Sequence, residues 1–243
     1  MKSFRERMLD SSARSKSRVV LALDVSGPFG TRIARAREIL ELTKDSVAAV
    51  KANYHILLPF GLEGLSGIVW TCKREGIPLI ADLKMNDIEA TNLNAVESLL
   101  SYGFDAVIAN PFVGLEGGLG GVVPALHAQG GGLILLVFMS HKGASEGYGL
   151  KVGGEPLYKE FARRARSWGA DGVVVSAKSP EKNAEVKEIV GKDCLIFSPG
   201  IGAQGGDSRA WASSGADFMI VGRTIIESKD PASELKELNG ASA

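Results

Sequence analysis

The sequence has few cysteines and histidines, and this scarcity argues against several kinds of protein. Its 243 residues include two cysteines, Cys72 and Cys194, which are too few for a disulfide framework and lack metal-ligand spacing. The three histidines, His55, His127 and His141, are scattered without the spacing of a zinc site. We therefore expect two structural cysteines and no metal site.

Long apolar runs and an excess of one charge are also missing. The longest apolar runs, such as residues 133–139, are too short to span a bilayer, and no signal-peptide pattern opens the chain. Lys plus Arg equals Asp plus Glu at 28 each, so the electrostatic footprint of a nucleic-acid or membrane-binding protein is absent. We expect a cytoplasmic protein with a small-molecule partner, and with neither nucleic acid nor membrane as a partner.

What the sequence does contain is a regular alternation of two kinds of segment. A composition of 45% hydrophobic and 23% charged residues suits one large domain. Short β-rich runs alternate with segments of 3.6-residue apolar spacing. The β-rich runs are residues 18–25, 46–54, 78–84, 104–112, 132–140, 171–178, 194–200 and 217–223. Eight βα units predict an α/β fold, a single (β/α)8 TIM barrel, with a doubly wound open sheet as the competing architecture.

We expect one catalytic barrel domain over residues 18–243, preceded by a short lead-in. Residues 1–17 are polar and basic, and we interpret them as a solvated lead-in that can place one helix turn under the barrel. Several helical segments end in glycine just before the next strand, at Gly76, Gly103, Gly169 and Gly215.

Charged residues stand where these strands end. In residues 78–84 the alternation of a strand puts Asp82 and Lys84 on one face, while Leu79, Ala81 and Leu83 form a wholly apolar face. The apolar face suits packing against helices, so the charged face points into the barrel mouth, where barrel enzymes build their active sites. A structural ion pair is the alternative interpretation of these two charges.

Two more charges converge on the same mouth, because Asp24 closes the first strand and Lys51 interrupts the second. Buried charges must be paired, so an apolar residue would pack there at lower cost. Four charged residues at strand ends are more plausibly one functional site than four independent coincidences. Residues 198–207 (SPGIGAQGGD) follow strand seven and Arg223 ends strand eight, where barrels commonly bind phosphate.

These motifs resemble those of the orotidine 5'-phosphate decarboxylase family, in its short prokaryotic form. DLKMNDIEAT, which contains Asp82, Lys84, Asp87, Ile88 and Thr91, is similar to the family's Asp-x-Lys-x-x-Asp-Ile signature. The segments 21–24, 50–51, 138–144, 198–207 and 221–225 follow in the family's order, so the resemblance spans essentially the whole barrel. One departure is a lysine at position 142, where the family often has proline after Ser-His.

The resemblance implies the decarboxylation of orotidine 5'-phosphate to uridine 5'-phosphate, in pyrimidine biosynthesis, without metal or other cofactor. It implies that Lys84 is the acid, that Asp82 lies against the departing carboxylate, and that Lys51, Asp82, Lys84 and Asp87 form a tetrad. It also implies a homodimer with shared sites, in which Asp87 enters the partner's site. The implied substrate-binding residues are Asp24, Lys51, Ile88, Thr91, Ser140, Pro199, Gln204, Gly222 and Arg223.

Two other functions stay open at this stage. Sugar-phosphate decarboxylases and hexulose-phosphate synthases of the same suprafamily share the Asp-x-Lys-x-x-Asp pattern, so a metal-dependent sugar-phosphate lyase or aldolase is one. A catalytically silent barrel that binds a phosphate ligand is the other. In addition, residues 142–154 contain five glycines, and we interpret this loop as a lid that folds over the substrate.

Overall fold

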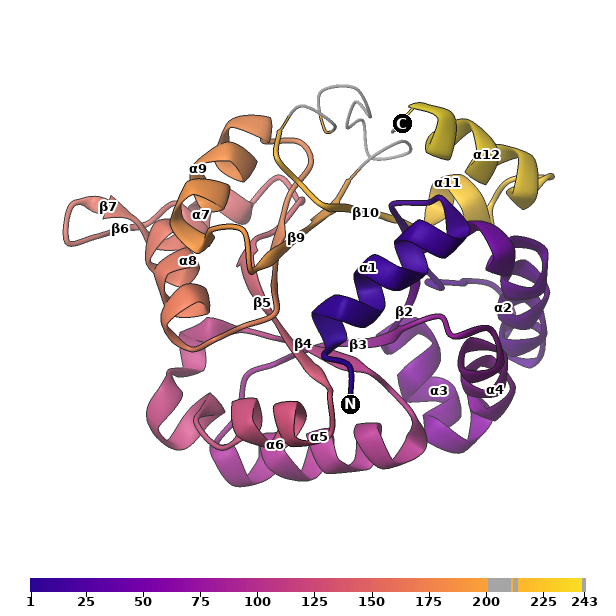
Figure 1. Cartoon of the computed structure of the whole chain (residues 1–243), viewed down its shortest axis with the longest axis horizontal. Coiled ribbons are helices and arrows are strands. Elements are labelled where there is room, and N and C mark those ends of the chain that lie inside the picture. The colour runs from indigo at the N-terminus through magenta and orange to yellow at the C-terminus, as the bar shows by residue number, and fades with distance from the viewer. Residues whose placement is uncertain (201–210, 212–213, 242–243) are drawn as a thin grey trace.

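Eight parallel strands close a barrel, as the spacing of the β-rich runs predicts. In the computed structural model, which describes residues 1–200, 211 and 214–241, the strand order is β1-β10-β9-β8-β5-β4-β3-β2. The barrel strands are β1 (Val19–Ala22), β2 (Ala49–Asn53), β3 (Leu79–Met85), β4 (Ala106–Ala109), β5 (Gly132–Phe138), β8 (Gly172–Val175), β9 (Leu195–Pro199) and β10 (Phe218–Val221). Seven predicted runs contain one strand each, β3 extends one residue beyond its run, and the closed order rules out the open sheet (Figure 1).

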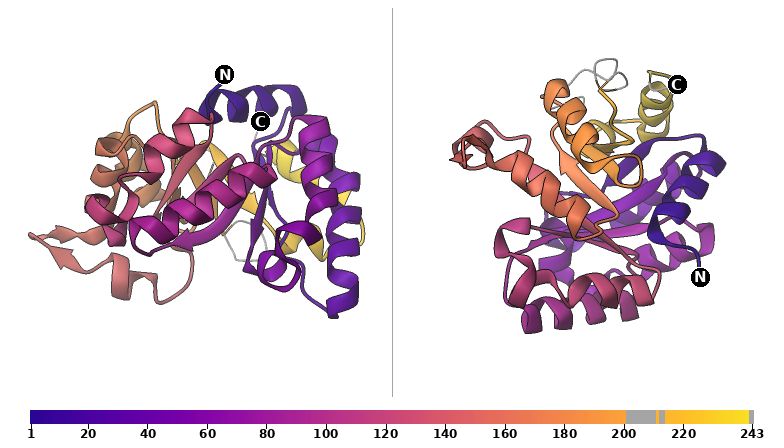
Figure 2. Two further views of the ribbon diagram at one scale, coloured as in Figure 1. Left: turned by 90° about the horizontal axis from the view of Figure 1, so that it is seen from below. Right: turned by 60° about the vertical axis from the view of Figure 1, so that its left-hand side comes forward.

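Helices form a layer around this barrel, as Figures 1 and 2 show from three sides. They are α1 (Phe4–Ser15), α2 (Phe29–Thr43), α3 (Tyr54–Gly64), α4 (Ser66–Glu75), α5 (Glu89–Tyr102), α6 (Val122–Ala128), α7 (Ala144–Tyr148), α8 (Leu157–Ser167), α9 (Pro180–Val190), α11 (Arg223–Ile226) and α12 (Pro231–Ala241). The fold also contains three short helical segments, η1 (Lys44–Ser46), η2 (Pro111–Val113) and η3 (Leu115–Leu119). A small hairpin consists of β6 (Lys151–Val152) and β7 (Glu155–Pro156). Among the described helices, none spans a membrane by its own length and hydropathy; α3 and α4 pass that test only together, across an 89° bend.

Alternation along the strands divides the core into two parts. Leu79 and Ala81 belong to the larger apolar cluster between strands and helices, and Leu83 packs against it. Ile80 belongs to the smaller cluster inside the barrel. The predicted orientation of β3 is therefore confirmed, and the residues that follow Ile80 in alternation, Asp82 and Lys84, point into the barrel.

The N-terminal segment forms a longer and more buried helix than the single turn expected from its polarity. Helix α1 has 12 residues, and it begins with a capping box between Ser3 and Glu6. Phe4 and Met8 are fully buried inside the barrel cluster, and the Phe4 ring stacks on Phe197 at 6.5 Å. Apolar residues four apart share one helix face, and with the ion pair of Arg7 and Asp105 they dock the helix across the end of the barrel (Figure 1).

Local backbone signals at the helix ends also behave as predicted. Gly76 and Gly103 are the C-caps of α4 and α5, with φ of 64° and 114°, the left-handed region that favours glycine. Both cysteines are free thiols in buried positions, and burial raises the pKa of each. They are structural, as expected.

Candidate active site

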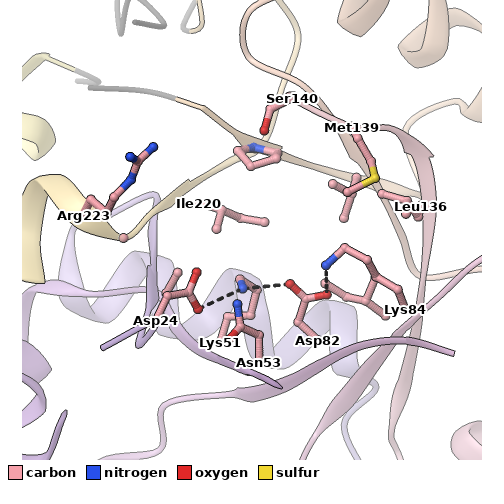
Figure 3. A pocket seen from close by; sticks show the side chains of 15 residues that line it. Asp24, Lys51, Asn53, Asp82, Lys84, Leu136, Met139, Ser140, Ile220 and Arg223 are labelled. Carbon is pink, nitrogen blue, oxygen red and sulfur yellow. Dashed lines mark hydrogen bonds and ion pairs between the residues drawn. The ribbon is translucent and has the colours of Figure 1, made fainter. Parts of the chain in front are cut away.

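A cavity of about 190 Å³ opens at the carboxyl ends of the barrel strands, where the sequence places its charged residues. Its lining consists of Ala22, Asp24, Lys51, Asn53, Asp82, Lys84, Ile108, Leu136, Met139, Ser140, Val174, Pro199, Ile220, Gly222 and Arg223. Figure 3 shows the charged side chains in a row, with Arg223 beyond Asp24 at one end and Lys84 at the other. Polar groups therefore converge on a pocket whose remaining walls are largely apolar.

Three side chains form a continuous chain of ion pairs along this row. Lys51 Nζ lies 2.8 Å from one carboxylate oxygen of Asp82, and Lys84 Nζ lies 2.7 Å from the other. Only 5% of the Lys51 side chain and 8% of the Asp82 side chain are exposed, against 33% for Lys84. The Asp82 carboxylate is thus held from both sides, while Lys84 alone of the three reaches toward solvent.

The charges of this chain are fixed by mutual pairing. Burial alone would raise the pKa of Asp82, but the ammonium groups of Lys51 and Lys84 outweigh it and hold that pKa below its usual value. Burial likewise opposes the charge on Lys51, yet the carboxylates of Asp82 and Asp24 outweigh it and raise the pKa of Lys51. Both groups are consequently ionised at neutral pH.

Asp24 and Asn53 add two more polar side chains to this row. Asp24 Oδ1 lies 3.6 Å from Lys51 Nζ, too far for a strong hydrogen bond, and this buried oxygen has no hydrogen-bond partner. Asn53 ends β2 two residues after Lys51, on the same face of the strand, and its side chain accepts from the backbone N–H of His55. Sequence reasoning missed Asn53, although its alternation with Lys51 was a usable signal.

The backbone at the end of β3 is unusual. Lys84 has φ of 46°, in the left-handed region that few residues other than glycine adopt. The register between β3 and β4 shifts between Ala81 and Met85, so this part of β3 bulges away from its neighbour. Bulges next to active sites re-aim side chains, and this irregular stretch contains both Asp82 and the Lys84 that contacts it.

The opposite wall of the cavity contains four more of the predicted substrate-binding residues. Ser140 follows β5, Pro199 ends β9, and Gly222 and Arg223 join β10 to α11. Arg223 is the first residue of α11, so its side chain stands where the last barrel strand ends. Gln204 lies outside the described residues, as does most of the glycine-rich turn that contains it.

Asp87, Ile88 and Thr91 do not line the cavity of their own chain. All three are exposed, and 64% of Ile88 is open to solvent. Asp87 Oδ1 accepts from the N–H of Ile88, and the carbonyl of Asp87 accepts from the buried amide of Asn92 at 2.6 Å. Within one chain, therefore, three members of the predicted tetrad meet and Asp87 stands apart.

The segment predicted as a lid forms two ordered pieces. Helix α7 packs through Tyr148 against Phe138 and Phe161, with ring centroids at 5.9 and 6.1 Å. The hairpin of β6 and β7 then projects away from the barrel (Figure 1). Among the described residues, no group of three or more His, Cys, Asp or Glu side chains is arranged to hold a metal ion.

A scan against protein-family models matches residues 17–238 to the orotidine 5'-phosphate decarboxylase / HUMPS family. The chain belongs to this family. It is 36% identical to the orotidine 5'-phosphate decarboxylase of Pyrococcus abyssi over an alignment of 221 residues. This alignment covers 90% of this chain and 96% of the relative.

Solved structures of the decarboxylase family share the fold. The orotidine 5'-monophosphate decarboxylase of Methanocaldococcus jannaschii, complexed with the inhibitor BMP, aligns with a TM-score of 0.76 and 30% identity, over 93% of this chain and 98% of that one. The UMP synthase of Leishmania donovani aligns with a TM-score of 0.86 and 27% identity, over 99% of this chain and 56% of that longer one. The cavity described above is thus the candidate active site of an orotidine 5'-phosphate decarboxylase family member.

Proposed function

We propose that this chain decarboxylates orotidine 5'-phosphate to uridine 5'-phosphate, the decarboxylation step of de novo pyrimidine biosynthesis, with its own side chains as the catalytic groups. The observation that carries the proposal is the order of charges across the cavity, from Arg223 through Asp24 and Lys51 to Asp82 and Lys84 (Figure 3). A nucleotide presents a phosphate, a ribose and a base in the same linear order.

The phosphate end is assigned to Arg223 and the backbone of Gly222. A guanidinium binds phosphate through two parallel N–H bonds, and the first turn of a helix adds N–H donors. Gln204, which lies outside the described residues, is proposed to bridge the phosphate and the base. Asp24 and Lys51 are assigned to the ribose hydroxyls. Asp24 Oδ1 is buried and has no hydrogen-bond partner, so a ribose hydroxyl can donate to it.

The base end is assigned to Ser140, Pro199 and Lys84. Ser140 hydrogen-bonds the amide edge of the pyrimidine, and Pro199 lines the apolar part of the pocket. In the reaction, the bond between C6 and the carboxylate breaks, carbon dioxide leaves, and the electron pair remains at C6. The Lys84 ammonium stabilises this charge and transfers a proton to C6, so that a C6–H bond forms. Solvent then returns a proton to Lys84.

Asp82 acts on the other end of the bond that breaks. Its carboxylate is ionised and nearly buried, so the substrate carboxylate placed beside it is repelled, and this repulsion falls as neutral carbon dioxide forms. Meanwhile the attraction of Lys84 grows as charge develops at C6. The two effects favour the transition state over the bound substrate, which is the requirement for catalysis.

We also propose that the enzyme is a cytoplasmic homodimer with shared sites, in which Asp87, Ile88 and Thr91 of each chain complete the site of the other. Tyr54, Leu58, Ile88 and Phe112 are 47–74% exposed although they are large and apolar. They follow the carboxyl ends of β2, β3 and β4, which are neighbours in the barrel. An exposed apolar face beside the cavity fits a two-fold interface that delivers Asp87 across it. The cytoplasmic assignment rests on the charged nucleotides, which do not cross membranes unaided.

Turnover assays separate this function from the two alternatives. A metal-dependent sugar-phosphate lyase would act on a sugar phosphate and lose activity in chelator, whereas we expect loss of orotidine 5'-phosphate absorbance at the same rate with and without chelator. A silent barrel would show thermal stabilisation by uridine 5'-phosphate with no turnover. The curated relatives are named as decarboxylases, and they favour turnover of orotidine 5'-phosphate at the same rate with and without chelator.

Subunit mixing tests the shared site. Lys84→Ala and Asp87→Ala are each expected to be nearly inactive. In a hybrid dimer, both lesions fall in one site and the other site is wild-type, so random pairing restores about one quarter of wild-type activity. If Asp87 served its own barrel, every site would keep one lesion, and demonstrated exchange of subunits would restore nothing.

A further inference from the structure

The carbonyl of Leu83 receives its hydrogen bond from a side chain. Leu83 lies beyond the last pair of the β2–β3 ladder, which is Asn53 with Asp82, and inside the register shift between β3 and β4. A strand carbonyl outside the regular ladder pairs with another donor or with water, and the register shift leaves the Leu83 carbonyl in that position. The hydroxyl of Tyr54 donates to it at 2.5 Å.

This hydrogen bond acts on the conformation of Lys84. The carbonyl of Leu83 and the N–H of Lys84 belong to one planar peptide unit, so rotation of that unit changes φ of Lys84 directly. Lys84 holds φ of 46°, a conformation that persists only where the surroundings impose it. A donor fixed on the Leu83 carbonyl supplies such a constraint at the adjoining bond.

The backbone of Tyr54 is anchored at the start of a helix. It is the first residue of α3, and it directly follows Asn53, whose side chain caps that helix by accepting from the N–H of His55. The same short stretch carries Lys51, which holds the other oxygen of Asp82. The end of β2 therefore fixes Asp82 through an ion pair and the peptide before Lys84 through a hydroxyl.

We propose that Tyr54 is a positioning residue for Lys84, which holds the left-handed backbone of Lys84 so that its ammonium stays against Asp82 in the reactive geometry. This inference rests on the proposed function, because it gives Lys84 the role of proton donor. Tyr54 does not line the cavity, and it acts through the backbone of its neighbour rather than on the substrate.

The test compares Tyr54→Phe, which removes only the hydroxyl, with Tyr102→Phe, a matched control at the far end of α5. We expect Tyr54→Phe to lower kcat by about tenfold, because small displacements of a catalytic group are costly. KM and the inhibition constant of uridine 5'-phosphate should stay within about twofold of wild-type. The displaced group, the Lys84 ammonium, acts in the transition state and contributes little to the binding of substrate or product. Replacing Tyr54 by para-aminophenylalanine, which keeps a donor on the ring, should restore most of the lost kcat.

A crystal structure of Tyr54→Phe and sedimentation of the dimer complete the experiment. We expect φ of Lys84 to leave the left-handed region, or Lys84 to separate from Asp82, with no change in assembly. Unchanged kcat together with an unchanged Lys84 backbone would overturn the proposal, as would a loss of kcat that only follows loss of the dimer. If the wild-type protein has no turnover, the proposed function fails, and the backbone of Lys84 in the variant still decides whether Tyr54 positions it.

Discussion

Replacing Lys51 by methionine removes the buried cation between two carboxylates and tests the electrostatics of the site. The side chains of Lys51 and Asp82 are 5% and 8% exposed, so Asp82 would keep a buried charge with only Lys84 beside it, and Asp24 would lose its cation. Breaking one partner of a buried pair costs about 3–5 kcal/mol. Methionine fills a similar volume, so a packing defect contributes little, and we expect a loss in this range at neutral pH.

The pH dependence of that loss identifies its cause. In the wild-type protein the pKa of Asp82 lies below its ordinary value of 3.8, so its contribution to stability is present above that pH and is lost as the pH falls through the folded-state pKa. Without Lys51, only Lys84 opposes the effect of burial, so we expect the folded-state pKa of Asp82 to rise. The variant then gains stability relative to wild-type as acid neutralises the Asp82 carboxylate, which has lost one of its two cations.

Urea unfolding of both proteins at about pH 7.5 and about pH 4.5 measures these two effects. The expected result is a stability gap of about 3–5 kcal/mol at the higher pH that narrows at the lower pH. Leu57→Met, which changes a buried apolar residue without touching the ion pairs, controls for packing. A gap below about 1 kcal/mol, the range of an exposed ion pair, would refute the reasoning, as would a gap of constant size.

Three further predictions concern other parts of the molecule. Lys84→Ala should lower kcat by about 10³-fold or more while uridine 5'-phosphate still binds by calorimetry; a loss of only a few-fold would place the acid elsewhere. Arg223→Ala should cost about 2–5 kcal/mol of transition-state binding, measured as kcat/KM, and unchanged kinetics would move the phosphate site away from β10. Phe4→Ala should reduce the free energy of unfolding by about 3–5 kcal/mol, and a negligible loss in urea titration would show that α1 does not close the barrel in solution.

Much of the fold was predictable because its signals are local. Strand alternation placed Asp82 and Lys84 inside the barrel, and the repeated βα spacing placed Asp24, Lys51 and Arg223 at one mouth. Short apolar runs mark the strands, and glycine caps mark the helix ends that precede several of them; both signals stand in the sequence itself. The docking of α1 was not predictable from its polarity, because Phe4 and Met8 are its main apolar contacts and its arginines bind partners far away in the sequence, such as Asp105 and the carbonyl of Gly76.

Other features depend on contacts that no sequence pattern announces. The left-handed backbone of Lys84 lies in the register shift between β3 and β4, and the hydrogen bond from Tyr54 to Leu83 joins the start of α3 to β3. The outward path of the β6–β7 hairpin is likewise a matter of tertiary packing. The exposure of Asp87 is a property of one chain, and its proposed role requires a second. Such features need the assembled molecule.

Release of carbon dioxide from orotidine 5'-phosphate labelled in its carboxylate tests the central claim most directly. The purified protein, treated with chelator and supplied with no cofactor, is incubated with the labelled substrate, and labelled carbon dioxide and uridine 5'-phosphate are measured together. Our account predicts equal amounts of the two products from wild-type protein, and almost none from Lys84→Ala. Wild-type protein that binds the substrate but releases no labelled carbon dioxide would contradict it.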